Sequence, residues 1–384
     1  MILHTLLDYD TLRVIWWLLL GVLLVGFAVT DGFDLGVGTL LPFVARNDVE
    51  RRVVINTVGP VWEGNQVWLI LGGGAIFAAW PHIYAMSFSG FYLAMFATLF
   101  ALILRPVGFK YRSKHESAAW RSTWDWALFI GGFVPALIFG VALGNVLQGV
   151  PFRFTNDMRM VYEGSFFGLL NPFALLAGLV SVAMLAMHGG AWLALKTEGT
   201  VAERSRSFAT AASIATIVLY ALAGVLLWKV VGGYELTSAH VAGGPSNPLA
   251  KTVASGVAGG WFTNYRNHPW TMLAPVLGFA GALLALLGLR ARWEGITVIF
   301  SGLSVAGIVL SVGASMFPFI MPSSIDLRSA LMVWDASSSH LTLFIMLVCA
   351  VVFVPLILAY TTWVYRVMWG KVRTHDITHG DHAY

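Results

Sequence analysis

Long apolar runs separated by short polar connections dominate this sequence. A helix that crosses the hydrocarbon layer needs about 20 mostly apolar residues. Nine runs reach that length, and they cover roughly residues 13–40, 55–80, 83–107, 124–148, 165–195, 207–231, 271–290, 295–320 and 341–366. The runs lack the alternation of barrel strands, so each one predicts a helix. The pattern predicts an all-α integral membrane protein with about nine spans, one transmembrane domain over residues 1–384, and a longer connection at 232–269.

Composition supports lipid as the solvent of this chain. The sequence is 58% hydrophobic and only 11% charged, with a mean hydropathy of +0.77, which excludes an ordinary soluble domain. The net charge of +4 does not indicate nucleic acid as a partner, because the basic residues are spread over short loops between apolar runs. The single cysteine, Cys349, excludes an internal disulfide and a cysteine-bound cluster.

The distribution of basic residues predicts the orientation of the helices. Of the 23 Lys and Arg residues, 15 lie in one set of connections and 7 in the opposite set, while Arg105 lies at a helix end. The richer set is expected in the cytoplasm. The N-terminus is then outside and the C-terminus inside, which requires an odd number of spans and agrees with nine.

Carboxyl groups inside the spans are costly and therefore need a reason. Asp31 and Asp34 lie three residues apart and share a helix face, as do Glu63 and Gln66 on the next helix. Glu63 is expected about two turns from the loop, with no basic neighbour in sequence. One interpretation is a proton entry route from Glu63 and Gln66; the alternative is that these groups only anchor helix ends. Asp31 is expected to be structural or close to the surface.

Two further charged residues, Arg105 and Asp125, lie near predicted helix boundaries. They fit either function or a purely structural role, in which Arg105 pairs with Asp34 or with Asp125. The glycines at 32, 36, 38 and 72–74 are expected to pack helices closely.

The histidines argue against haem in this chain. Only His188 lies clearly within a span, and a membrane b-type haem usually takes axial ligands from facing helices. We therefore predict no haem ligand and no metal site here, and expect His188 to be a hydrogen-bonded packing residue.

At these residues the sequence resembles subunit II of cytochrome bd quinol oxidases, including the cyanide-insensitive branch, over essentially its whole length. The stretches that carry the resemblance include Leu12-Arg-Val-Ile-Trp-Trp17, Asp31-Gly-Phe-Asp34, Trp62-Glu-Gly-Asn-Gln-Val-Trp68, Phe88-Ser-Gly-Phe-Tyr92, Arg105-Pro-Val-Gly-Phe109 and Met316-Phe-Pro-Phe-Ile-Met-Pro-Ser-Ser324. So many collinear segments make coincidence an inadequate explanation.

The resemblance implies a bacterial cytoplasmic-membrane subunit with two four-helix bundles and one peripheral helix. Its partner, subunit I, would hold haems b558, b595 and d and oxidise quinol, while the complex reduces O2 to water. Some members hold a structural quinone in subunit II, and a small single-span third subunit is a further candidate partner. Positions matching the family assign Glu63 and Tyr384 to a proton route, Trp68 to oxygen access, and Asp34, Arg105 and Asp125 to haem-site support.

Two hypotheses of other classes compete with this one. A proton-coupled secondary transporter often has inverted repeats with broken helices meeting at mid-membrane, and no matching pair of interrupted segments is visible here. A haem or quinone carrier acting alone is disfavoured by the histidine positions.

Overall fold

The computed structural model describes residues 6–379, most of them in helices. The helices are α1 (Tyr9–Val44), α2 (Asp48–Val58), α3 (Trp62–Ala79), α4 (Pro81–Gly90), α5 (Tyr92–Tyr111), α6 (Ala118–Gln148), α7 (Pro172–Lys196), α8 (Gly199–Lys229), α9 (Thr263–Asn267), α10 (Leu273–Ala291), α11 (Glu294–Met316), α12 (His340–Val367) and α13 (Thr374–His379). The strands are β1 (Phe152–Phe154), β2 (Met160–Tyr162), β3 (Gly233–Leu236), β4 (Val253–Val257), β5 (Phe319–Met321) and β6 (Leu331–Met332). They form three short antiparallel pairs, β1–β2, β3–β4 and β5–β6, in the connections.

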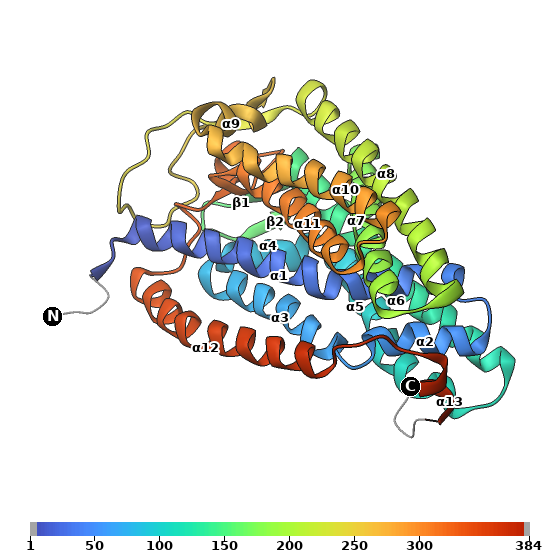
Figure 1. The fold of residues 1–384 in the computed structure, drawn as a ribbon. Coiled ribbons are helices and arrows are strands. Elements are labelled where there is room, and N and C mark those ends of the chain that lie inside the picture. Colours follow the sequence, from blue (N-terminus) through green and yellow to red (C-terminus); the bar gives the residue numbers. More distant parts are fainter. Residues whose placement is uncertain (1–5, 380–384) are drawn as a thin grey trace.

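The long helices form two groups of four and one helix at the edge. In the first group α1, α3, α5 and α6 pack together; in the second α7 packs on α8 and α11, and α10 packs on α8 and α11. The two groups meet where α7 packs on α1 and α6. The last long helix, α12, runs along the edge of the bundle beside α3 and α1 (Figure 1). The predicted all-α membrane fold is confirmed.

Eight of these helices in the described chain are long and apolar enough to cross a membrane. The ninth predicted span corresponds to α3, which has 18 residues and carries Glu63, Asn65 and Gln66 in its first two turns. These polar side chains lower the hydropathy of its first turns, and α3 is not among the eight.

Several predicted boundaries differ from the structure, and all but the one at Phe91 lie beside a proline. The predicted span 55–80 is broken at Gly59 and Pro60, and α3 begins only at Trp62. The span 83–107 is divided at Phe91 between α4 and α5. The span 165–195 begins only at Pro172 in α7. The run 295–320 leaves the helix at Met316, before Pro318. Proline lacks the N–H that would continue a helix and favours the first helical turn instead.

Close helix packing depends on glycine at some predicted positions only. A Cβ on Gly36 of α1 would lie 2.0 Å from the carbonyl oxygen of Leu185 on α7, so only glycine allows this approach. Gly38 and Gly132 make a similar contact between α1 and α6. At residues 72–74 no other helix of the described chain lies within 4 Å of a built Cβ, so these three glycines do not bring helices of this chain together.

Polar contacts tie the 232–269 connection to the start of α1. The buried guanidinium of Arg13 donates to Asp10 Oδ1 (2.8 Å), Ser337 Oγ (2.9 Å) and the Gly244 carbonyl (3.0 Å), and it lies 3.5 Å from the Tyr9 ring centroid. These bonds leave the buried cation fully surrounded by acceptors. The long connection is therefore an ordered cover over one end of the bundle.

A second buried ion pair joins the 232–269 connection to the segment that precedes α12. Lys251 Nζ lies 2.6 Å from Asp335 Oδ2, and the other carboxylate oxygen accepts from the backbone N–H of Met332 at 3.0 Å. Burial lowers the pKa of Lys251 and raises the pKa of Asp335, while the attraction between the two groups opposes both shifts.

The first and last spans begin at the same end of the bundle. His340, the first residue of α12, bonds through Nε2 to the carbonyl of Leu7 at 2.7 Å. At the other end Lys196 of α7 donates to the carbonyls of Met368 and Gly370 at 2.8 and 2.9 Å. Helices α1 and α12 therefore run in the same direction, as an odd number of spans requires.

Candidate functional site

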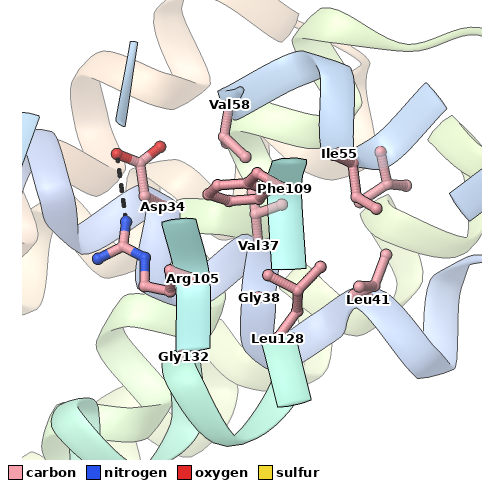
Figure 2. Close-up of a pocket in the computed structure, with 11 residues that line it drawn as sticks. Asp34, Val37, Gly38, Leu41, Ile55, Val58, Arg105, Phe109, Leu128 and Gly132 are labelled. Atoms are coloured by element: carbon pink, nitrogen blue, oxygen red, sulfur yellow. Dashed lines mark ion pairs between the residues drawn. The ribbon is translucent and has the colours of Figure 1, made fainter. Parts of the chain in front are cut away.

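A buried ionic cluster joins α1 to α5 in the first helix group. The guanidinium of Arg105 donates to both carboxylate oxygens of Asp31, at 2.8 and 3.0 Å, in a two-point contact. Its Nη2 also lies 3.8 Å from Asp34 Oδ2, the ion pair drawn in Figure 2. All three side chains are almost fully buried.

Two neutral groups extend this network toward α12. Asn65 of α3 donates from Nδ2 to Asp34 Oδ2 at 2.8 Å, and its Oδ1 accepts from the hydroxyl of Tyr365 at 2.7 Å. We refer to Asp31, Asp34, Asn65, Arg105 and Tyr365 as the interior cluster. It links four helices, α1, α3, α5 and α12, and so ties the peripheral helix to the first group.

The local sequence explains how these side chains meet. Asp31 and Asp34 lie one helical turn apart on α1 and face α5 together. Arg105 reaches them because α6 presents Gly131, where a Cβ would lie 2.9 Å from Arg105 Cγ. The guanidinium also lies 5.8 Å from the ring centroid of Trp62, a cation–π contact at the start of α3.

The charges of the interior cluster are unequal. It contains two carboxyl groups and one guanidinium, and Asp31 takes both strong contacts of the guanidinium. Asp34 Oδ1 is buried and has no hydrogen-bond partner in the described chain. Asp34 and Arg105 line an internal cavity of about 10 Å³, the size of one water molecule, whose other walls include Val37 and Phe109 (Figure 2).

Asp125 belongs to a different cluster. Its carboxylate accepts from Arg112 Nε at 2.5 Å and from Arg51 Nη1 at 2.7 Å. Asp48 bonds Arg112 at 2.9 Å and Arg121 at 2.8 Å. We refer to these five residues as the end cluster, because they join the ends of α2, α5 and α6. Arg105 was expected to pair with Asp34 or Asp125. It does lie near Asp34, but its stronger contact is with Asp31, and it does not pair with Asp125.

One expectation about depth was wrong. Glu63 lies in the first turn of α3 rather than about two turns from the loop, because the helix breaks at Gly59 and Pro60. Its side chain is exposed on this chain, and Gln66 is partly exposed. Asp31 was expected to be structural or close to the surface, and the structural alternative holds, since it is completely buried beside Arg105. Tyr384 lies outside the described residues.

Trp68 lies at an open cavity of about 550 Å³ between α1, α3 and α12. The ring is buried, and Gly26 of α1 leaves room for it, because a Cβ there would lie 2.7 Å from the indole. Its Nε1 has no hydrogen-bond partner in the described chain. Tyr365 of the interior cluster lines the same cavity.

His188 is a hydrogen-bonded packing residue, as predicted. Its Nδ1 lies 2.8 Å from Ser301 Oγ, and its Nε2 lies 2.9 Å from the Val29 carbonyl. Both ring nitrogens are therefore engaged, and His188 joins α7 to α1 and α11.

Sequence reasoning missed six members of the clusters: Asn65 and Tyr365 in the interior cluster, and Asp48, Arg51, Arg112 and Arg121 in the end cluster. Asn65 stands between Glu63 and Gln66 in a polar stretch of an otherwise apolar run, which is a usable signal. Arg112 looked like one more cytoplasmic loop cation, and Tyr365 like one more aromatic residue at a helix end. Their roles depend on distant partners, 13 residues away for Arg112 and 300 for Tyr365.

The fold and these clusters define a multi-span membrane protein that buries charges between helices and exposes others on its outer surface. The family model for cytochrome bd terminal oxidase subunit II matches residues 12–368 of this sequence. The chain belongs to this family, and it is therefore a subunit of a bd-type terminal oxidase that partners a subunit I. Haem cofactors belong to such a complex.

Individual relatives agree with the family match. The chain is 51% identical to the cytochrome bd-I ubiquinol oxidase subunit 2 of Escherichia coli (strain K12), over 98% of this chain and 100% of that protein. It is 50% identical to a probable cytochrome oxidase subunit 2 of Haemophilus influenzae, with the same coverage. It is 32% identical to the cytochrome bd ubiquinol oxidase subunit 2 of Bacillus subtilis, over 94% of this chain and 97% of that protein.

A solved structure supports the fold. A chain of the bd oxidase from Geobacillus thermodenitrificans superimposes with a TM-score of 0.67, over 93% of this chain and 98% of that one, at 16% sequence identity. This likeness concerns the fold alone. None of these findings supports the alternative hypothesis of a proton-coupled transporter.

Proposed function

We propose that this chain supports the haem-bearing subunit I of a quinol:oxygen oxidoreductase and contributes to its proton and oxygen access. In this proposal subunit I holds haems b558, b595 and d and oxidises quinol, and the complex reduces O2 to water. Protons for water come from the cytoplasm, so the reaction is electrogenic without pumping. The observation that carries the proposal is the family match over residues 12–368, together with buried charges that fix four helices of this chain.

The support role follows from the two clusters. The interior cluster sets the distance between α1, α3, α5 and α12, and the end cluster sets the ends of α2, α5 and α6. A subunit whose helices are held at fixed positions presents a fixed surface to its partner. Asp34, Arg105 and Asp125 thus support the haem site through the shape of this chain, without contact with a haem.

The proton route begins at Glu63 and Gln66 on the outer face of α3. An exposed carboxyl at a helix N-terminus can exchange protons with water and with a neighbouring subunit. The interior cluster is a poor continuation, because the Asn65 amide between Tyr365 and Asp34 does not carry a proton at ordinary pH. We therefore place the route from Glu63 between this chain and subunit I, with Tyr384 as a further member assigned from the family.

Oxygen access is assigned to the cavity at Trp68. Its walls include Leu358 and two tryptophans, Trp68 and Trp369, and it is open to the outside of this chain. An apolar gas partitions into lipid, so an opening in the membrane-facing surface is a suitable entrance.

Orientation follows the charge bias. The end that holds the end cluster, Arg204 and Lys196 is also the end richer in basic residues, and we assign it to the cytoplasm. The N-terminus is then periplasmic and the C-terminus cytoplasmic in a bacterial inner membrane. A structural quinone and a small single-span third subunit are additional components that the family suggests.

Glu63→Gln in the assembled complex tests the proton route. The substitution keeps shape and removes the ionisable group, so we expect quinol oxidase turnover to fall about tenfold or more while the complex assembles with a normal haem spectrum. Oxygen consumption by the purified complex is the measurement.

Glu203→Gln is the matched control, because Glu203 is another exposed carboxyl, on α8, with only a 3.8 Å contact to Arg292. It should leave turnover unchanged. Wild-type turnover in Glu63→Gln, at normal complex yield, would refute the proton route.

A further inference from the structure

The open cavity at α12 has an unusual chemical character. About 550 Å³ in volume, it is lined by apolar and hydroxyl groups and by one guanidinium, that of Arg366 in the last turn of α12. None of the described lining residues is acidic. A small-molecule or lipid site commonly has this volume, with mostly apolar walls and a few polar groups.

Most hydroxyl groups in the cavity wall already donate hydrogen bonds within this chain. Thr30 donates to the Gly26 carbonyl at 2.7 Å, Thr362 to the Leu358 carbonyl at 2.7 Å, and Tyr365 to Asn65. In contrast, neither the exposed Arg366 guanidinium nor the Thr361 hydroxyl has a partner among the side chains and carbonyls of the described residues. The cavity thus offers free donors and a free positive charge, which suit a ligand with negatively charged acceptors.

The wall that carries Arg366 is fixed in place. Lys196 of α7 donates to the carbonyls of Met368 and Gly370, and its Nζ lies 5.6 Å from the ring centroid of Trp369. Trp369 is exposed at the end of α12, where tryptophan commonly lies at the headgroup level of a bilayer. The cationic end of the cavity therefore lies at headgroup depth, while Leu358, two turns earlier in α12, lies at acyl-chain depth.

We propose that this cavity binds one anionic phospholipid. The phosphodiester accepts from Arg366 and Thr361, and the upper part of an acyl chain lies against Leu358 and Trp68. Basic pockets between transmembrane helices on the cytoplasmic side favour anionic headgroups in this manner. A quinone headgroup fits less well, because its carbonyls are uncharged and form no charge-assisted hydrogen bond of the kind that a phosphodiester forms with a guanidinium.

Bound at this position, the lipid lies at the cavity that contains Trp68 and Tyr365. It occupies the space between the peripheral helix and α1 and α3. Because an apolar gas dissolves among acyl chains, the lipid does not close the oxygen entrance assigned to Trp68. Anionic phospholipid is thereby a structural ligand that holds α12 against the first helix group.

Native mass spectrometry of the assembled complex tests this proposal. The complex is reconstituted in phosphatidylcholine nanodiscs with a minor fraction of phosphatidylglycerol, released, and scored for retained phosphatidylglycerol. We expect one retained molecule in the wild type, retention about tenfold lower in Arg366→Gln, and a smaller loss in Thr361→Val. The readout is lipid retention, so it is independent of oxidase turnover and of the proposed proton route.

Arg290→Gln is the matched control, since Arg290 is an exposed cation in the last turn of α10, outside the cavity. It should retain the lipid as the wild type does. Equal losses in the two variants would overturn the proposal, because they would indicate general attraction to the basic surface. It would also be overturned if Arg366→Gln lowered quinone content but not phosphatidylglycerol, or if inorganic phosphate alone displaced the lipid.

Discussion

The interior cluster and the end cluster bury carboxylates beside arginine in opposite ways. In the interior cluster one guanidinium, Arg105, serves two carboxyl groups, and all three charged side chains are at most 3% exposed. In the end cluster three arginines serve two carboxylates, and Asp48 is 37% exposed. The interior cluster has no spare arginine and almost no solvent exposure, whereas the end cluster has a spare arginine and a partly exposed carboxylate.

This difference determines which residues the fold cannot lose. Removal of one partner from a buried ion pair leaves an uncompensated charge, at a cost of about 3–5 kcal/mol. Removal of one partner from a shared, partly exposed network leaves the others to rearrange, with water to assist. The three positions that the family associates with haem-site support are therefore not equivalent: Arg105 and Asp34 belong to the first situation, and Asp125 to the second.

Arg105→Met should have the largest effect. It leaves Asp31 and Asp34 together in an apolar interior, so we expect a loss of about 3–5 kcal/mol of unfolding free energy, with low complex yield and a disturbed haem spectrum. Thermal unfolding of the purified complex and its absorption spectrum are the measurements.

The double variant Arg105→Met, Asp31→Leu is the control for this effect. It removes both members of the closest pair and should recover much of the lost stability, since well-packed apolar residues can replace a buried ion pair. If the double variant were as unstable as Arg105→Met alone, the uncompensated Asp31 carboxylate would not be the cause.

Asp125→Asn should have a smaller effect that salt can moderate. The Arg112 guanidinium keeps Asp48, and Arg51 is already 26% exposed. We expect a loss of about 1–3 kcal/mol, and a decrease in that loss as ionic strength rises, because salt screens the exposed repulsion between the arginines. Unfolding at low and high salt, for this variant and for Arg105→Met, separates the two clusters. A loss that is equally insensitive to salt in both variants would contradict the comparison.

The sequence predicted the helices well, because long apolar runs depend on local composition. It also predicted that Asp31 and Asp34 share a face, since helical spacing is local. It failed where prolines divided an apolar run, as at Pro60, and this one break moved Glu63 from the expected interior to the first turn of α3. An apolar run shows that residues are in lipid, but not where the helix within it begins.

The partners of the buried charges were beyond the reach of sequence reasoning. Arg105 bonds Asp31 across 74 residues, and Arg112 bonds Asp48 across 64. Which carboxylate each arginine meets depends on the rotation of α1, α5 and α6 about their axes, and that rotation depends on glycine contacts such as Gly38 with Gly132. Without these packing contacts, Asp34 and Asp125 were equally good candidates for Arg105.

The smallest effect should come from an ion pair beside the end cluster. Glu50 of α2 accepts from Arg204 Nη1 and Nη2 at 2.9 and 2.8 Å, and these hydrogen bonds lower the pKa of Glu50 from 4.5 to about 2. A lowered pKa in the folded state stabilises the fold fully above pH 4.5, and this stabilisation is lost as the pH falls toward 2. Because both side chains are partly exposed, we expect Glu50→Gln to cost only about 1 kcal/mol at pH 7, and nothing further once the wild-type carboxylate is protonated. The unfolding free energies of the wild type and Glu50→Gln should therefore converge as the pH falls from 7 to 2.5.

Glu163→Gln is the control, since the Glu163–Arg153 pair is 46% exposed on both sides and should contribute nothing measurable at any pH. Curves for wild type and Glu50→Gln that stay parallel over this range would assign the stabilisation to packing instead of charge.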